Sequence, residues 1–306
     1  MADKEIKGVI VPMLTPLNPD ETVDIGSLRR LVNYLIDNGV HGLWASGTTG
    51  EFANLPDSER VRAMEATVDE VAGRVPVICN ISSTSTKMSV ELASEVRELG
   101  MDGIALTPPY YYPDSQDELA DHYRYAQDQI GLPLWVYNIP QTVKTAVEPG
   151  TIAMLAAEGT VVGVKDSSGA GELLAQLNVL CDQGDLSLLR FLGTVFRVTS
   201  AGSVGVHGVI PGIANLVPEV CARGWEAGEA GDTETVRDCN GKLLTAQKVG
   251  AVAKGGSANA ASFGGMKAAL KQMGVIDHDI MSRPFRQLTE EEKSQIPPIL
   301  EDLGLK

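Results

Sequence analysis

The sequence lacks the features that mark membrane, metal-binding or disulfide-rich proteins. No apolar run approaches the ~18 residues that a transmembrane helix requires, and the first residues contain no apolar segment typical of a signal peptide. The four cysteines lie far apart without a Cys-x-x-Cys pair, and the four histidines show no metal-ligand spacing. We therefore expect a cytoplasmic protein that works without a disulfide framework or a metal.

Basic residues are scarce relative to acidic ones. The 306 residues include 25 Lys and Arg against 40 Asp and Glu, a net charge of −15 at pH 7. A surface of this sign repels phosphate backbones and anionic lipids, which argues against nucleic-acid and membrane partners. The acidity fits an ordinary cytosolic enzyme, and it also fits a high-salt habitat. It does not exclude an anionic substrate, because a few local donors can outweigh the overall sign.

What the sequence does contain is a regular alternation of short apolar runs and longer amphipathic segments. The apolar runs are continuous rather than alternating, which is typical of strands buried on both faces of a parallel sheet. Eight such pairs favour a (β/α)8 TIM barrel over a doubly wound sheet. We expect the barrel to occupy residues 1–230, with residues 231–306 as a C-terminal helical extension of the same domain.

The expected elements follow from these runs. Strands are predicted over residues 8–14, 42–46, 75–81, 102–107, 132–138, 160–165, 186–193 and 204–210. Helices of the barrel are predicted over residues 24–37, 57–73, 87–99, 115–129, 149–157, 170–182, 195–201 and 215–227. Helices of the extension are predicted over residues 232–250, 260–273 and 289–303.

Polar residues gather where the expected strands end. In a barrel of parallel strands these ends meet at one face, where the active sites of such barrels lie. The segments concerned are GTTGE (47–51), TPPYYY (107–112), YNIP (137–140), GVKDSSG (163–169) and HGVIPG (207–212).

Lys165 ends the apolar run TVVGVK and is expected to point into the barrel mouth. Desolvation there disfavours the ammonium form, lowers the pKa of the lysine and leaves an amine that can attack a carbonyl carbon. A buried lysine is more often held in a salt bridge, here with Asp166 or with a carboxylate on a neighbouring strand. Position alone leaves both interpretations open.

Two further segments could work with this lysine. Tyr137 ends the preceding strand, and because neighbouring strands lie ~4.8 Å apart, its phenol could shuttle protons near Lys165. The turn GTTGE offers two hydroxyls and several backbone N–H groups, a nest suited to a carboxylate. A core tyrosine and a tight turn without ligand explain the same residues when each is taken alone.

Taken together, these motifs resemble the dihydrodipicolinate synthase / N-acetylneuraminate lyase family of class I aldolases. The resemblance is collinear from GVIVPMLTPL (8–17) to HGVIPGIAN (207–215) and extends more loosely through MKAAL (266–270). It implies a (β/α)8 barrel with a helical extension, a homotetramer, and catalysis without a dissociable cofactor. The order GTTGE, TPPYY, YNIP, GVKDSSG is its most specific part.

The resemblance also assigns roles to individual residues. It implies that Lys165 forms the Schiff base and that Tyr137 relays protons, with Thr49 and Tyr111 completing the relay. In some members of the family, the tyrosine that matches Tyr111 comes from a neighbouring subunit. The remaining roles implied are to hold the substrate carboxylate or line the pocket, and they fall on Thr48, Thr49, Gly47, Gly193 and Ile210.

Two departures from the family pattern bear on the substrate. Thr142 stands where the resemblance places the arginine that dihydrodipicolinate synthases use for their second substrate. Gly193 is followed by Thr194, Val195 and Phe196, where neuraminate lyases carry acidic residues. We therefore expect a pyruvate-dependent aldolase that makes or cleaves a 2-keto-3-deoxy sugar acid or a 4-hydroxy-2-oxo acid.

Three alternatives remain open from the sequence. The first is 4-hydroxy-tetrahydrodipicolinate synthase, which joins pyruvate and aspartate semialdehyde, with Lys144 as the nearest candidate to bind the second carboxylate. The second is a dehydratase that uses the same imine to expel a hydroxyl group. The third is a catalytically idle paralogue that binds 2-oxo acids.

Overall fold

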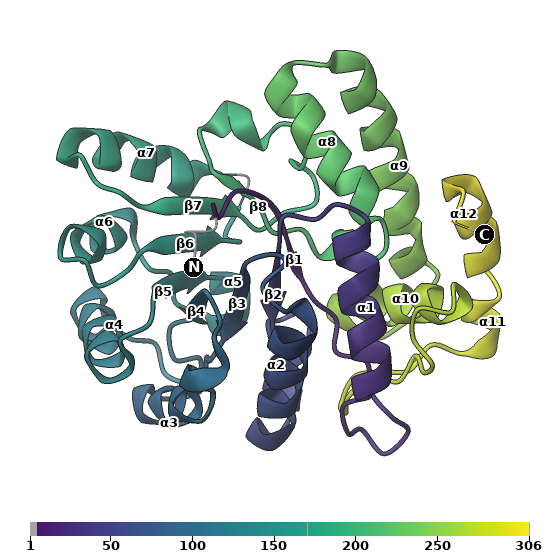
Figure 1. The fold of residues 1–306 in the computed structure, drawn as a ribbon, viewed down its shortest axis with the longest axis horizontal. Coiled ribbons are helices and arrows are strands. Elements are labelled where there is room, and N and C mark those ends of the chain that lie inside the picture. The colour runs from purple at the N-terminus through teal and green to yellow at the C-terminus, as the bar shows by residue number, and fades with distance from the viewer. Residues whose placement is uncertain (1–4, 170, 306) are drawn as a thin grey trace.

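The computed structural model describes residues 5–169 and 171–305, and it forms a closed barrel of eight parallel strands (Figure 1). The strands pair in sequence order, and the last pairs with the first. This confirms the (β/α)8 barrel that the alternating pattern predicts. The strands are β1 (Gly8–Pro12), β2 (Gly42–Ala45), β3 (Val77–Asn80), β4 (Gly103–Leu106), β5 (Leu134–Asn138), β6 (Gly163–Asp166), β7 (Leu189–Leu192) and β8 (Gly208–Val209).

Helices cover the outside of the barrel and continue beyond it. Those between strands are α1 (Ile25–Asp37), α2 (Asp57–Val71), α3 (Thr86–Val96), α4 (Gln116–Ile130), α5 (Pro140–Val143), α6 (Pro149–Ala157) and α7 (Glu172–Gly184). Those after β8 are α8 (Pro218–Ala230), α9 (Thr233–Ala251), α10 (Ala258–Gln272), α11 (Glu290–Lys293) and α12 (Ile296–Leu303). The helix predicted over residues 170–182 is observed as α7, and its predicted first residue, 170, lies outside the described residues.

Local sequence explains where several helices begin. Ser115 caps α4, and Glu118 bonds back to the backbone of Ser115, so that two otherwise unpaired N–H groups are satisfied. Asp24 caps α1 and Ser85 caps α3 without a reciprocal bond; each side chain accepts one backbone N–H group.

Two helix predictions are wrong. No α-helix forms over residues 195–201; the chain makes turns there and then a 3-10 helix over Ala201–Val204. The run before it is rich in β-branched residues, and two glycines follow, both unfavourable for a helix. The single helix expected over residues 289–303 is divided into α11 and α12, because Pro297 and Pro298 suit only the first turn of a new helix.

The barrel lumen holds a core of its own, separate from the larger apolar layer between strands and helices. Trp44 lies edge-on to Trp135, with ring centroids 6.1 Å apart, and to Tyr137 at 5.6 Å. Phe191 packs on Trp135 with the centroids 5.4 Å apart. These rings fill the lumen, so that the space above them at the strand ends is where a ligand can bind.

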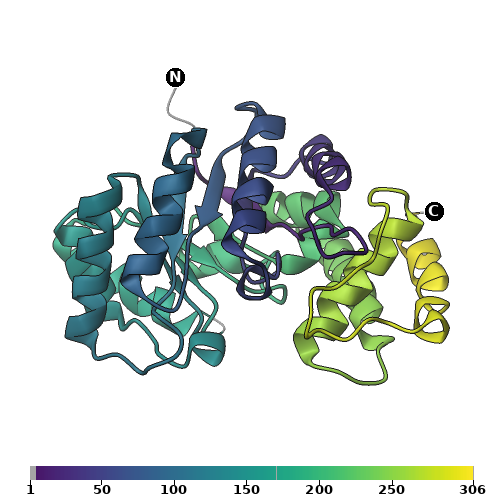
Figure 2. The same ribbon diagram turned by 90° about the horizontal axis from the view of Figure 1, so that it is seen from below.

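The C-terminal helices form a group on one side of the barrel (Figure 2). Helix α9 packs against α8, and α10 and α12 pack against α9. Asp232 caps α9 directly after α8 ends at Ala230. The extension is therefore continuous with the last helix of the barrel.

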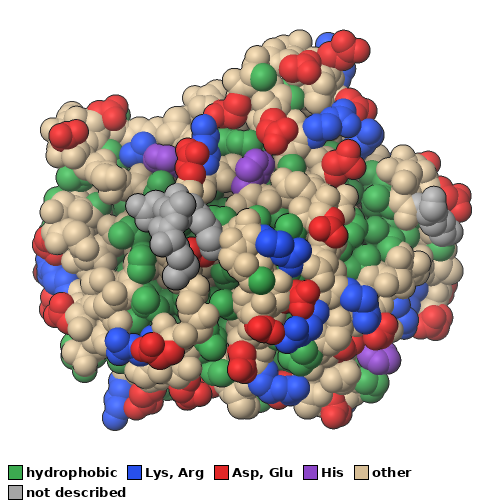
Figure 3. All heavy atoms as spheres, viewed as in Figure 1, with side chains coloured by type: hydrophobic (Ala, Val, Ile, Leu, Met, Phe, Trp, Pro, Cys, Tyr) green, Lys and Arg blue, Asp and Glu red, His purple; other side chains and the backbone are tan. Residues whose placement is uncertain are grey.

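Charged side chains of both signs are spread over the surface of the molecule. Figure 3 shows acidic and basic groups interspersed over one face of the molecule, without a large area of a single sign. Among the described residues, no helix is long and apolar enough to cross a membrane.

Candidate active site

The sequence-predicted lysine and tyrosine lie side by side in the barrel. Strands β5 and β6 pair in parallel with Tyr137 opposite Lys165, so both side chains point into the lumen. The Lys165 ammonium nitrogen Nζ lies 4.1 Å from the centroid of the Tyr137 ring and 4.9 Å from the Trp44 ring. The register of two neighbouring strands therefore brings the predicted nucleophile against the predicted proton relay.

Lys165 is buried among aromatic rings. Its residue exposure is 3%, and burial lowers the pKa of its amine from the ordinary value to about 7. A lysine in this range carries a substantial fraction of neutral amine near neutral pH, which is the form that attacks a carbonyl.

The alternative interpretation of Lys165, a salt bridge to Asp166, is not what the structure contains. Asp166 points to the opposite side of β6, where its Oδ1 accepts hydrogen bonds from the Asn138 side chain and the Ser168 backbone. No ion pair between described residues involves Lys165. The alternation of side chains along a strand separates the two neighbours, so the lysine sits in the lumen without a counter-ion.

A hydroxyl chain connects Tyr137 to the turn after β2. The Thr48 Oγ1 atom lies 2.9 Å from the Tyr137 hydroxyl, at hydrogen-bond distance. Burial raises the pKa of Tyr137 to about 12, and the bond from Thr48 opposes that rise. The phenol is therefore protonated in the resting protein and can give a proton to an oxygen that becomes negative during a reaction.

The turn over residues 47–51 is tightly folded. The Gly47 carbonyl accepts the backbone N–H of Gly50, and the Thr48 carbonyl accepts that of Glu51. Ser46, just before the turn, and Glu51, its last residue, both adopt left-handed backbone angles, with φ of 54° and 60°. Non-glycine residues adopt such angles at some cost in free energy, and they are concentrated at functional sites.

One detail of the expected relay is corrected. The prediction placed Thr49 between two tyrosines, but the structure places Thr48 on Tyr137. Successive residues of the turn face different ways, and the buried Thr49 side chain faces Gly212 instead. Thr49 is thus next to the loop after β8, where its role in binding a carboxylate remains a prediction.

Gly193 and Ile210 lie beside the same end of the barrel. The Gly193 N–H donates to the Asp166 carbonyl at 2.7 Å, and the Ile210 N–H donates to the Leu192 carbonyl at 2.9 Å. A Cβ atom at Gly193 would lie 2.1 Å from the Ser167 hydroxyl, so that side chain would have to move to admit a larger residue. Ile210 is buried in the lumen core together with Tyr137.

Tyr111 lies away from the other predicted residues within one chain. Its side chain is 72% exposed and contacts the ring of Tyr112, with the centroids 5.0 Å apart. The neighbouring Tyr110 faces inward instead, where it lines a cavity together with Thr48. The relay role of Tyr111 therefore stays a prediction, one that requires a second copy of the chain.

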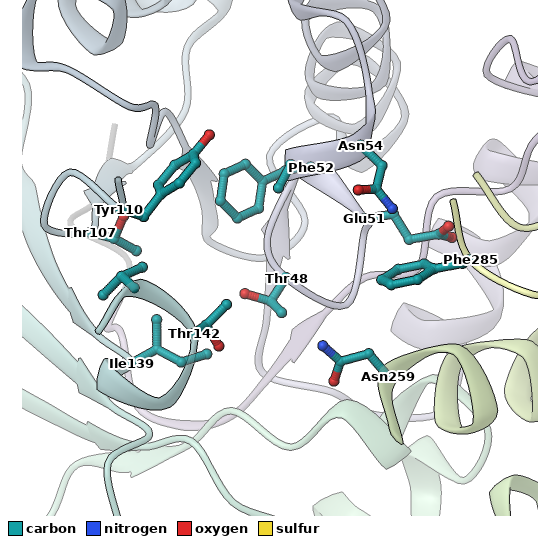
Figure 4. Close-up of a pocket in the computed structure, with 12 residues that line it drawn as sticks. Thr48, Glu51, Phe52, Asn54, Thr107, Tyr110, Ile139, Thr142, Asn259 and Phe285 are labelled. Carbon is teal, nitrogen blue, oxygen red and sulfur yellow. The ribbon is translucent and has the colours of Figure 1, made fainter. Parts of the chain in front are cut away.

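The extension supplies residues that the sequence did not indicate. Glu51 and Lys267 form a fully buried ion pair, and the Ser282 N–H and hydroxyl donate to the same carboxylate at 2.8 and 2.7 Å. Asn259 and Phe285 line the cavity beside Thr48 (Figure 4). These residues are distant from the barrel motifs along the chain, so no local spacing connects them.

The described residues contain no group of three or more His, Cys, Asp and Glu side chains placed to hold a metal ion. The functional groups of the site are an amine, a phenol and two threonine hydroxyls. A buried lysine of low pKa at the carboxyl end of a parallel barrel, next to a phenol, is an arrangement typical of barrel enzymes that form Schiff bases.

Comparison with known proteins agrees with this class. The sequence model of the Dihydrodipicolinate synthetase family matches residues 5–303. An uncharacterised DapA-like lyase of Halobacterium salinarum is 34% identical over 300 residues, which cover 98% of this chain and 95% of the relative. A 4-hydroxy-tetrahydrodipicolinate synthase of Syntrophus aciditrophicus is 33% identical over 299 residues, which cover 98% of this chain and 99% of that protein.

The solved structures include a dihydrodipicolinate synthase from Bacteroides thetaiotaomicron. It superposes with a TM-score of 0.91 at 31% sequence identity, covering 98% of this chain and 100% of that one. The chain belongs to the dihydrodipicolinate synthetase family. It is accordingly a lyase of the class I aldolase type.

Proposed function

We propose that the protein is a pyruvate-dependent aldolase that makes or cleaves a 4-hydroxy-2-oxo acid or a 2-keto-3-deoxy sugar acid. The observation that carries the proposal is Lys165, buried without a counter-ion beside the Tyr137–Thr48 hydroxyl pair. Its Nζ attacks the C2 carbonyl of the 2-oxo acid, water leaves, and a protonated imine remains. The substrate carboxylate lies on the turn that contains Gly47, Thr48 and Thr49.

The imine then acts as the electron sink. Tyr137 gives its proton to the carbinolamine hydroxyl as that group leaves as water, which makes it a phenolate. In the cleavage direction this phenolate accepts the proton of the C4 hydroxyl, the C3–C4 bond breaks, and an aldehyde leaves. The electron pair of that bond forms an enamine of pyruvate, which is protonated at C3 and hydrolysed to regenerate the Lys165 amine. No metal or dissociable cofactor enters this sequence.

The test is turnover of a synthetic 4-hydroxy-2-oxo acid, followed as pyruvate release with lactate dehydrogenase and NADH. Release of pyruvate together with an aldehyde supports the proposal. A dehydratase would instead give a product that keeps all its carbon atoms, and an idle paralogue would give none. Condensation of pyruvate with aspartate semialdehyde tests the synthase alternative, which the name of the Syntrophus relative favours.

The assembly and location of the enzyme belong to the same proposal. The exposed Tyr111 and Tyr112 rings favour a homotetramer in which a second copy covers this part of the mouth. The site is expected to act in the cytoplasm. Analytical ultracentrifugation tests the tetramer, and steady-state kinetics of Tyr111→Phe test whether the Tyr111 hydroxyl takes part in turnover.

The pH dependence of the reaction follows from the pKa of Lys165. Only the neutral amine attacks, so kcat/KM for pyruvate should rise about tenfold per pH unit below pH ~6 and level off above pH ~8. The bend should fall near the Lys165 pKa of about 7. A steady-state profile between pH 5 and 10 measures it. A profile still rising above pH ~9 would show a lysine of ordinary pKa and contradict the account.

The hydroxyl pair makes a separate prediction. Thr48→Val keeps the shape of the side chain but removes its bond to Tyr137, so kcat should fall about 100-fold with a smaller change in the KM for pyruvate. Thr48→Ser keeps a hydroxyl and serves as the matched control, with most of kcat retained. Steady-state kinetics of the two variants, checked by thermal unfolding, make the comparison. Equal kcat values for Thr48→Val and Thr48→Ser would show that the Thr48 hydroxyl takes no part in the relay.

A further inference from the structure

The cavity at the barrel mouth bears on the second substrate, and this inference rests on the proposed function. It has a volume of about 120 Å³ and lies between the turn after β2, the short helix α5 and the extension (Figure 4). Thr48 is part of its wall, and the Thr48 hydroxyl bonds to Tyr137. A group in this cavity therefore lies next to the relay, where the carbonyl of an incoming aldehyde must be protonated.

Most of the cavity wall is apolar. Phe52 and Tyr110 meet edge to face with ring centroids 6.3 Å apart, and the buried Ile139 and Val143 side chains come from the loop after β5 and from α5. Phe285 faces them from the extension, and its ring packs edge-on against that of Phe263 with the centroids 6.2 Å apart. Such a wall binds a planar apolar body by dispersion and edge-on ring contacts.

Among the described residues, the cavity has no charge available for a ligand. Glu51 is its only ionisable carboxylate, and that group is taken up by Lys267 and Ser282. The Arg60 guanidinium is 3% exposed, lies 5.1 Å from the centroid of the Phe52 ring and bonds to Asp57. An anionic aldehyde would lose its hydration here without gaining a cationic partner among the residues that line the cavity.

We propose that the aldehyde partner is uncharged and has a compact apolar body of about one ring. The cavity volume of about 120 Å³ is close to that of the ~150 Å³ apolar cavities that bind benzene in proteins. The enamine C3 attacks the aldehyde carbon, and the aldehyde oxygen takes its proton from Tyr137. Thr142 and Asn259 supply the neutral polar groups at the rim.

A second groove would suit a different kind of aldehyde. It is lined by Gly193, Thr194, Gln247 and Ser262, among others, and its polar groups are hydroxyls, an amide and backbone. A polyhydroxylated aldehyde would suit this groove better than the aromatic cavity. The choice between the two grooves is the choice between an apolar and a sugar-like aldehyde.

Three aldehydes test the proposal with pyruvate and the unmodified enzyme. Benzaldehyde carries the apolar body, 4-carboxybenzaldehyde adds one negative charge to the same body, and glyceraldehyde replaces the ring with hydroxyl groups. Initial rates of C–C bond formation give kcat/KM for each. We expect benzaldehyde to exceed both others by about tenfold or more. Equal rates for all three, a preference for glyceraldehyde, or no condensation at all would overturn the proposal.

Two variants at the rim separate charge from shape. Thr142→Arg places a cation at the cavity and should raise the ratio of 4-carboxybenzaldehyde to benzaldehyde kcat/KM about tenfold. Thr142→Leu, which adds volume without charge, should not raise it. An unchanged ratio in Thr142→Arg would show that the aldehyde does not lie in this cavity.

The proposed function is tested independently of the aldehyde. Reduction of the pyruvate imine with borohydride requires no second substrate. If the imine is trapped but glyceraldehyde is preferred, the inference about the cavity fails and the aldolase stands. If no imine is trapped, the aldolase itself fails.

Discussion

Lys165→Met is expected to lower turnover at least about 1,000-fold while the protein keeps its fold. Methionine has nearly the same length as lysine and no nucleophilic nitrogen. It also suits the surroundings of Lys165, which are the aromatic rings of Trp44 and Tyr137 rather than a counter-ion. The melting temperature should therefore stay the same or rise, since the lumen loses a group whose charged form is disfavoured.

Two further variants complete this test. Lys165→Arg should also abolish turnover, because a guanidinium keeps its proton and cannot attack a carbonyl. Unlike methionine, it places a permanent charge in the lumen, so its stability should be lower. Lys87→Met changes a lysine whose side chain is 84% exposed on α3, and it should leave turnover intact. Residual rates near wild type in Lys165→Met would refute the role of the lysine.

Lys267→Met should destabilise the protein by about 3–5 kcal/mol. The substitution leaves the Glu51 carboxylate buried without its cation, although Ser282 still donates two hydrogen bonds to it. It also removes the bond from Lys267 Nζ to the Ile280 carbonyl at 2.7 Å. Because Glu51 ends the turn that contains Thr48 and Thr49, the KM for pyruvate should rise as well. Urea unfolding and steady-state kinetics measure the two effects.

The double variant separates the ion pair from general packing. Adding Glu51→Gln to Lys267→Met removes the orphaned charge, so a large part of the lost stability should return. If the double variant is as unstable as the sum of the two single ones, the pair contributes no coupling. We propose that residues 1–230 and 231–306 form one domain because this pair joins them, and a single unfolding transition is expected.

Much of the fold could be predicted because buried parallel strands leave a strong pattern. Continuous apolar runs such as residues 42–46 and 132–138 are typical of strands of this kind, and α1, α3 and α4 between the strands begin at side-chain caps. The helix predicted over residues 195–201 in the seventh unit does not form, because its sequence is rich in β-branched residues and the chain makes turns there. Strand β6 begins at Gly163 rather than at residue 160, since the Thr160 N–H turns back to the Leu155 carbonyl.

The site could be predicted only in part, for a related reason. Lys165 and Tyr137 end adjacent strands, so sequence spacing is enough to bring them together. The choice of Thr48 over Thr49 depends on the direction of each side chain in a turn that begins after the left-handed Ser46 and ends at the left-handed Glu51, and no sequence spacing reveals that direction. The local sequence signal for Lys267 is its position among the apolar residues of α10, where a lysine is unexpected. Its partner Glu51 lies 216 positions away, so no spacing predicts the pair.

The central claim is that Lys165 forms an imine with a 2-oxo acid, and trapping that imine tests it most directly. The protein is treated with pyruvate and sodium borohydride, digested, and analysed by mass spectrometry. The account predicts a single reduced pyruvate adduct, located on Lys165 and absent from Lys165→Met. An unmodified Lys165 under these conditions, or an adduct on another lysine, would contradict it.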